Sequence, residues 1–263
     1  MEKKSTIFLG FSDEELYVLL VYLGVSEMWG LEALEKRKLS VKKRELLLGV
    51  AERALVAREI LLPTPSGNFK LADIPHALLR TCANFTHLLQ IDCAGAGSAP
   101  LTYYYCHARK MYVLHTTPAQ HLHGFLAFGD QQAFSQSAFA VLGLREVPPP
   151  PCPPGQLSKE AYRDLKQAAR QGVEQALGVL SSSNLPPETA AAFIEALHNP
   201  VFKHALRLYQ KLPGGQEKFE GFTLLMAHNG LWILTPLEQD VVNIEPATFE
   251  DVSQRFSALM ADW

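Results

Sequence analysis

A run of prolines near the middle of the chain places the strongest constraint on its fold. Residues 147–155 read VPPPPCPPG. Proline has a fixed φ and no backbone N–H, so this segment can form neither a helix interior nor a central strand. Such a run favours the extended polyproline II conformation, a semi-rigid spacer that rises about 3.1 Å per residue. The sequence therefore predicts a linker at 147–155 between an N-terminal half, 1–146, and a C-terminal half, 156–263.

The two halves contain similar segments in the same order, which predicts an internal duplication. Residues 110–142 resemble residues 230–260, and residues 76–85 resemble residues 191–200. The aligned pairs are Met111 with Leu231, Thr117-Pro118 with Thr235-Pro236, Asn84 with Asn199, and Ser40 with Ser158. The alternative is chance similarity between two amphipathic stretches.

The order of elements in each half predicts the fold class. Each half reads helix, helix, strands, helix, and Asn229-Gly230 predicts a hairpin turn because both residues tolerate positive φ. Arg109-Lys110 stands in the corresponding place, and Asp130 and Thr248 are good N-cap residues before the final helices. We predict an α/β (α+β) protein with a central antiparallel or mixed sheet. Helical bundles flank this sheet, and a pseudo-twofold axis relates the two copies.

The N-terminal region adds further helices. Ser12 and Glu15 have the spacing of a capping box, and residues 40–62 have the pattern of one long amphipathic helix. A basic cluster, KRKLSVKKR, occupies residues 36–44. One interpretation is a winged helix over residues 31–71 that contacts nucleic-acid phosphates. The other is a solvated helix start, whose charge is balanced by neighbouring glutamates.

Composition argues against several classes of protein. The net charge is −3, so no general field attracts nucleic acid or an anionic membrane. No apolar run approaches the roughly 20 residues that span a bilayer, and the first residues lack the pattern of a signal peptide. The four cysteines form no C-x-x-C pair, so we interpret them as reduced thiols. These features predict a cytoplasmic protein.

Histidines raise the question of a metal site. If they lie on one strand, His121 and His123 point to the same side, and with His115 or Cys106 they could ligate zinc. The aligned residues of the second half, Gln239 and Val241, could not hold the same ion. No motif of a known catalytic site is present. We therefore predict no metal, no cofactor, no catalytic residue and no enzyme, while a metal-dependent enzyme at His121 and His123 remains an alternative.

The C-terminal half resembles a known family. It combines a hairpin with an aromatic strand, a proline turn, the pattern V-x-I-x-P-A-T and a final amphipathic helix. This combination is similar to EspG-type proteins, the cytosolic chaperones of type VII (ESX) secretion. The residues that carry the resemblance are Gly230, Trp232, Pro236, Val242, Ile244, Pro246, Ala247, Thr248 and Phe256. In the first half, the segment LADIPHALLRTCAN before the predicted sheet resembles the same family.

The resemblance implies protein binding without catalysis. An EspG-like scaffold would shield the apolar tip of a helical client protein before export, and it would need no membrane contact. The candidate partner-binding residues lie on strands beside the loop 92–100; they are Tyr103, Tyr105, His121, His123 and Phe125. Ordinary packing in the sheet is the alternative for each of them. A homodimer and a nucleic-acid-binding regulator are further alternatives.

Overall fold

The computed structural model describes residues 7–32, 39–95, 99–180, 185–212, 214–238, 240–261 and 263. It is an α+β protein, as the sequence predicts. The chain divides into two compact units. Unit 1 contains Met1–Leu89, Thr102–Gln136 and Gln210–Glu217, and unit 2 contains Gln90–Leu101, Ser137–Tyr209 and Lys218–Trp263.

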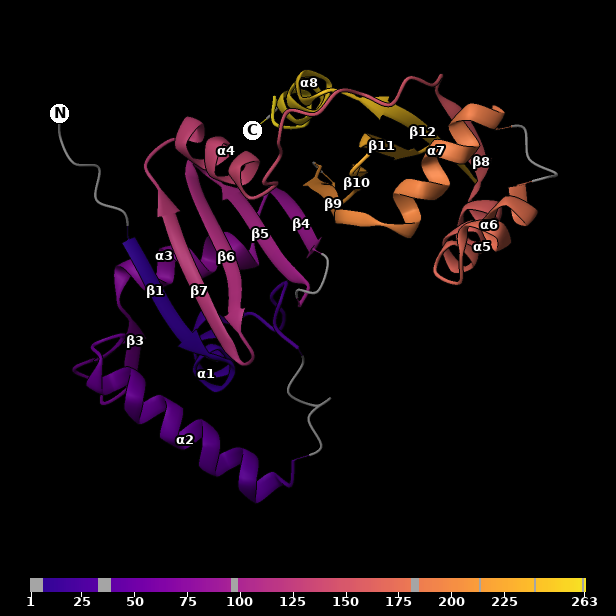
Figure 1. Cartoon of the computed structure of the whole chain (residues 1–263). Helices are drawn as coiled ribbons and strands as arrows, with labels where there is room; N and C mark the ends of the chain where they lie inside the picture. Colours follow the sequence, from indigo (N-terminus) through magenta and orange to yellow (C-terminus); the bar gives the residue numbers. More distant parts are fainter. Residues whose placement is uncertain are drawn as a thin grey trace. The chain divides into compact units, whose positions relative to one another are not determined.

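Unit 1 is built on an antiparallel meander that ends at an edge strand. Its strands lie in the order β1-β7-β6-β5-β4, and the β1/β7, β7/β6 and β6/β5 pairs are antiparallel. Helix α3 lies behind this sheet, and α2 lies below it in Figure 1. In chain order, the elements up to α4 are β1 (Ile7–Ser12), α1 (Asp13–Leu23), α2 (Val41–Ala57), β2 (Leu61–Pro63), β3 (Phe69–Leu71), α3 (Asp73–Ala83), β4 (His87–Gly95), β5 (Leu101–Ala108), β6 (Met111–Ala119), β7 (Leu122–Phe128) and α4 (Gln131–Ala140).

Unit 2 repeats this plan. Its strands lie in the order β9-β10-β11-β12-β8, and the β10/β11, β11/β12 and β12/β8 pairs are antiparallel. Its core packs α5, α6 and α7 against the sheet around the buried Trp232. The elements after α4 are β8 (Gly155–Ser158), α5 (Lys159–Ala169), α6 (Val173–Leu180), α7 (Pro187–His198), β9 (Pro200–Lys211), β10 (Glu217–Ala227), β11 (Gly230–Pro236), β12 (Val241–Ala247) and α8 (Phe249–Leu259).

Strand registers fix which residues of the two units correspond. In unit 1 His115 lies opposite Phe125, and in unit 2 Leu234 lies opposite Ile244. An offset of 119 residues relates the paired residues of the β6–β7 ladder to those of the β11–β12 ladder from Tyr112 to Thr116, and it is lost after Thr116, where the register of β6 shifts. The sequence alignment, which used offsets of 120 and 118, is therefore off by one residue. The earlier match of Asn84 with Asn199 agrees with the structure, because each is the C-cap of the helix before the meander.

Each unit begins with an edge strand that runs directly into a helix. Ser12 ends β1 and caps α1, while Ser158 ends β8 and caps α5. Ser12 and Glu15 form the predicted capping box. Ser12 and Ser158 therefore hold the same place in the two units, while Ser40, which also precedes a helix as expected, caps α2. The short strands were missed because four to six residues carry too little periodicity to reveal a strand.

Two local predictions need correction. The helix expected over residues 40–62 ends at Ala57, since Glu59 has a φ of 57° and Leu61–Pro63 forms a strand. The hairpin expected at Asn229-Gly230 exists, but its turn is centred one residue earlier, on His228 and Asn229.

The proline run packs against unit 2. Pro150 is buried, and its ring lies so close to Gly230 that a Cβ there would come within 2.4 Å of it. Thr189, at the start of α7, donates a hydrogen bond of 2.7 Å to the carbonyl of Pro153. Residues 147–154 form neither helix nor strand, the chain bends at Pro151 and Cys152, and the run belongs to unit 2.

None of the helices that the structure describes is both long enough and apolar enough to cross a membrane.

Candidate functional site

Two of the predicted partner-binding aromatic residues lie in the core of unit 1. Tyr105 is fully buried and meets the ring of Phe134 edge-on, with 5.2 Å between centroids. Phe125 is also fully buried, and its ring stacks on His115 at 4.6 Å. Burial leaves these two side chains no surface to offer a partner, so they stabilise the sheet. Tyr103 is half-buried on β5.

The two predicted histidines do not share a strand. His121 lies in the β6–β7 turn with a φ of 63°, and its side chain is 54% exposed. His123 lies on β7 and is buried. The expectation that both project from one strand face is therefore wrong. The sequence did hold a signal for the turn, because histidine adopts positive φ more often than most residues.

A buried carboxylate joins these histidines. Asp13, the first residue of α1, lies 2.7 Å from Nδ1 of His121 and 2.5 Å from Nε2 of His123. Nδ1 of His123 in turn lies 2.8 Å from Nε2 of His115. The network thus runs from the surface at His121 into the core at His115. The sequence could not reveal it, because 108 and 110 residues separate Asp13 from its two partners.

This network is suited to a structural role. His115 lies between the rings of Tyr104 and Phe125, and Gly30 packs against it. Burial and the neighbouring His123 lower the pKa of His115 to about 3, so its imidazole is neutral at physiological pH. No group of three or more His, Cys, Asp or Glu side chains among the described residues is arranged to hold a metal.

The cysteines lack the microenvironment of a nucleophile. Burial raises the pKa of Cys93 to about 11 and that of Cys82 well above its usual value. Both thiols are therefore protonated at neutral pH, and the thiolate is the reactive form.

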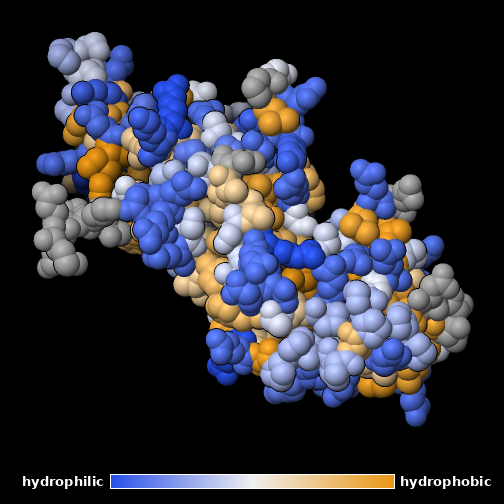
Figure 2. Space-filling view, turned by 90° about the horizontal axis from the view of Figure 1, so that it is seen from above, coloured by the Kyte–Doolittle hydropathy of each residue, from blue (hydrophilic) through white to orange (hydrophobic). Residues whose placement is uncertain are grey.

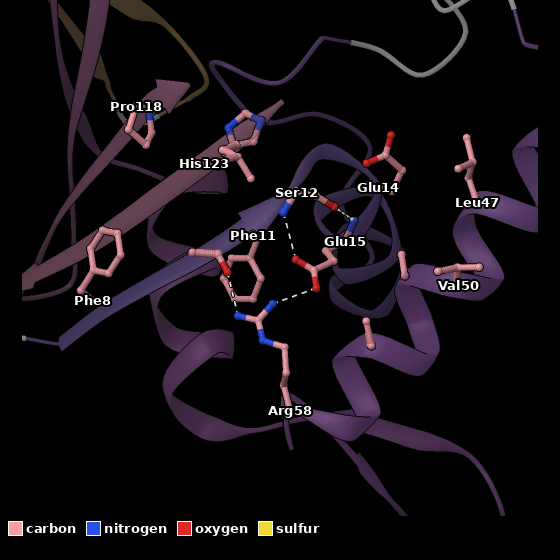
Figure 3. A pocket seen from close by; sticks show the side chains of 14 residues that line it. Phe8, Phe11, Ser12, Glu14, Glu15, Leu47, Val50, Arg58, Pro118 and His123 are labelled. Atoms are coloured by element: carbon pink, nitrogen blue, oxygen red, sulfur yellow. Dashed lines mark hydrogen bonds and ion pairs between the residues drawn. The ribbon is translucent and has the colours of Figure 1, made fainter. Parts of the chain in front are cut away.

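A groove opens between β1 and α2 in unit 1. It has a volume of about 520 Å³. One wall comes from the sheet and carries Phe8, Pro118 and Leu122; the other comes from α2 and carries Leu47 and Val50 (Figure 3). We call this cavity the β1–α2 groove.

The polar groups on the floor of the β1–α2 groove already have hydrogen-bond partners. Arg58 donates one hydrogen bond of 2.8 Å to Glu15 and another of 2.7 Å to the carbonyl of Gly10 (Figure 3). Glu15 also accepts a hydrogen bond from the backbone N–H of Ser12. The open hydrogen-bonding edge of β1 is thus partly occupied by Arg58.

The walls of the groove leave large apolar side chains in solvent. Phe8 is 61% exposed, Leu122 is 50% exposed and Val50 is 50% exposed. Leu46, on the same helix, is 65% exposed, while only Ala51 and Leu55 of α2 are buried. Hydrophobic residues also reach the surface at several separate places in the view of Figure 2. Sequence reasoning missed this groove because the amphipathic pattern of residues 40–62 does not show whether the apolar face of the helix will be covered. The available signal was the number of apolar residues on α2, which exceeds the two positions that are buried.

The basic cluster is only partly described. Residues 36–38 lie outside the described residues, as do residues 96–98 of the loop 92–100. Residues 41–44 form the exposed or half-exposed start of α2, after the N-cap Ser40. A two-stranded ladder of β2 and β3 follows α2.

Comparison with solved structures finds a similarity of fold. No family model matches the sequence, and no curated protein does. Among solved structures, the chain is similar to the Mycobacterium tuberculosis type VII secretion system chaperone EspG5, solved in complex with a PE25–PPE41 dimer. The TM-score is 0.65, the match covers 97% of this chain and 95% of that chain, and the sequence identity is 12%. The resemblance to EspG-type proteins is thereby confirmed for the fold.

Proposed function

We propose that this chain is a non-enzymatic, chaperone-like scaffold that binds a protein client in the cytoplasm. The observation that carries the proposal is the β1–α2 groove, with exposed apolar side chains on both walls. Exposed apolar surface of this kind marks interaction sites, because solvent exposure of Phe8, Val50 and Leu122 is unfavourable until a partner covers them. The EspG-like fold supports the same role, since EspG5 is a chaperone solved with bound proteins.

The groove favours a helical client over an extended one. An extended segment would bind by adding a strand to β1, and it would need the outward carbonyl of Gly10. That carbonyl already accepts a hydrogen bond from Arg58. A helix satisfies its own backbone and needs only apolar contacts, which both walls supply. The client in this proposal is therefore an amphipathic helix with an apolar stripe.

Substitutions on the two walls test the proposal. A client is first captured from native lysate, identified by mass spectrometry, purified and titrated against the chain by calorimetry. Val50→Asp places a charge in the contact and should weaken binding about tenfold or more. Val21→Asp is the matched control, because Val21 is 78% exposed on α1 and does not line the groove.

The outcomes separate the groove from the general role. If Val50→Asp and Val21→Asp bind the client equally well, the groove is not the docking site. If the captured protein carries no helix, the helical client is wrong. Elemental analysis tests the non-enzymatic role, since stoichiometric zinc would favour a metal-dependent enzyme, and gel filtration tests for a homodimer.

We also propose that the two units descend from one duplicated unit, with a division at 147–155. The support is the common spacing of 119 residues in both ladders and the shared order of edge strand, helices, meander and final helix. An experimental structure in which residues 111–128 superpose better on 230–247 at another offset would contradict this origin.

A further inference from the structure

A second cavity of unit 1 lies between α3 and the β5–β6 hairpin. Its volume is about 440 Å³, within the range of small-molecule sites. Arg80, His76 and Asn84 line it from α3, and Arg109 lines it from the hairpin turn. No acidic residue is among those that line it.

The charges of this cavity are unbalanced. In the part of the chain that the structure describes, neither Arg80 nor Arg109 forms an ion pair. The hydroxyls of Thr81 and Thr86 are already committed, since each donates to a backbone carbonyl. The end of α3 contributes about half a negative charge at most, against two full positive charges from the guanidinium groups. The cavity therefore attracts an anion.

The hairpin holds Arg109 at the cavity. Arg109 has a φ of 57° and Lys110 a φ of 96°, a region that L-residues other than glycine rarely adopt. Both residues form the two-residue loop of the β5–β6 hairpin, where positive φ matches the twist of the strands, so the turn itself fixes the backbone of Arg109 beside the cavity.

In unit 2 the corresponding hairpin is fastened to a helix. Its hairpin residue Asn229, at the position of Lys110, donates a hydrogen bond of 2.7 Å to the carbonyl of Ala192 on α7. Pro150 packs on the adjacent Gly230. In unit 1 the hairpin carries two cations in place of this tether. The difference between the units is thus a fastened hairpin in one and a basic cavity in the other.

We propose that this cavity binds the phosphate group of a small ligand. Guanidinium forks pair bidentately with phosphate oxygens, and donors on two separate elements suit a tetrahedral dianion better than a planar carboxylate. This site is separate from the β1–α2 groove and does not depend on the client-binding role.

Calorimetry with the full chain tests this proposal, with inorganic phosphate as the probe at constant ionic strength. Phosphate binds wild type, and Arg80→Gln and Arg109→Gln each weaken binding about tenfold or more, as expected for loss of a charged hydrogen-bond donor. Arg53→Gln is the charge-matched control, because Arg53 lies on α2 and does not line the cavity.

Lys110→Gly distinguishes binding from folding. Glycine relieves the φ of 96°, so this variant should unfold at a higher temperature and still bind phosphate through Arg109. Absence of phosphate binding to wild type would overturn the proposal, as would equal binding by Arg80→Gln and Arg53→Gln. Acetate binding as tight as that of phosphate would reassign the cavity to carboxylates.

Discussion

In each unit the edge strand runs into the first helix at a joint, where the first helical residue contacts a residue of a nearby turn. The acidic and basic residues of the two joints have exchanged places. In unit 1 the backbone N–H of Asp13 donates to the carbonyl of His121, and in unit 2 that of Lys159 donates to the carbonyl of Asp240. The turn residues His121 and Asp240 have φ values of 63° and 61°. A side-chain contact between an acid and a base also joins both positions, but the acid lies on the helix in unit 1 and in the turn in unit 2.

The two joints differ in burial and therefore in their expected contribution to the free energy of unfolding. The Asp13 side chain is 8% exposed, whereas that of Asp240 is 84% exposed. In unit 1, His123 and His115 continue the network from Asp13 into the core. The corresponding residues of unit 2 are Val242 and Leu234. The same backbone thus supports a buried polar network in one unit and an apolar core in the other. Buried polar groups are costly unless every partner is present, so unit 1 should respond far more strongly to substitution.

Removal of the buried carboxylate should have the largest effect. Asp13→Ala leaves two imidazoles without their acceptor and should lower the free energy of unfolding by about 3 kcal/mol. Urea denaturation measures this value. A loss no larger than that of a surface substitution would show that the network carries little stability.

Acid should destabilise unit 1 through His115. Its pKa is about 3 in the folded chain and 6.5 in the unfolded chain, so the unfolded state binds the extra proton between these values. Stability is therefore fully present above pH 6.5 and falls by up to about 1.4 kcal/mol per pH unit below it.

A replacement taken from unit 2 isolates this contribution. Burial also lowers the pKa of His107 and His204, so both add to acid sensitivity. His115→Leu installs the residue that unit 2 has at the corresponding position. It should reduce the slope of unfolding free energy against pH by the contribution of one titrating group. An unchanged slope would contradict the burial of a neutral His115.

The two N-caps should differ by a smaller amount. Ser12 takes part in a capping box with Glu15, whereas Ser158 accepts a single hydrogen bond, from the N–H of Ala161. Ser12→Ala should cost about 1 kcal/mol, and Ser158→Ala somewhat less. Urea denaturation of the two variants in parallel makes the comparison, and a reversed order would show that Glu15 adds nothing.

The exposed ion pair should have the smallest effect. The Lys159 ammonium holds the pKa of Asp240 below its usual value, but both groups are solvated. Lys159→Met should leave the thermal midpoint unchanged within error, because solvent screens such pairs. A clear decrease would mean that the surface joint is coupled to the core of unit 2.

Local signals predicted much of the fold. The capping boxes at Ser12 and Thr248 and the N-cap at Asp130 are present, because each depends on residues three positions apart. The hairpins near Arg109 and Asn229 also followed from strand patterns and turn residues.

The candidate sites could not be predicted in the same way. The β1–α2 groove and the Asp13 network depend on pairings across the sheet that local patterns do not encode. Tyr105 and Phe125 illustrate the problem, since an aromatic residue on a strand gives no sign of whether its face will be covered.

The packing of the proline run has a practical consequence for dissecting the molecule. A fragment that starts at Gln156 would lack Pro150, which packs on Gly230. It would also lack the carbonyl of Pro153, which accepts a hydrogen bond from the Thr189 hydroxyl. Such a fragment would present fresh apolar surface and aggregate more readily. Expression of the second half by itself should therefore start upstream of Val147, so that the proline run remains in the fragment and packs against unit 2.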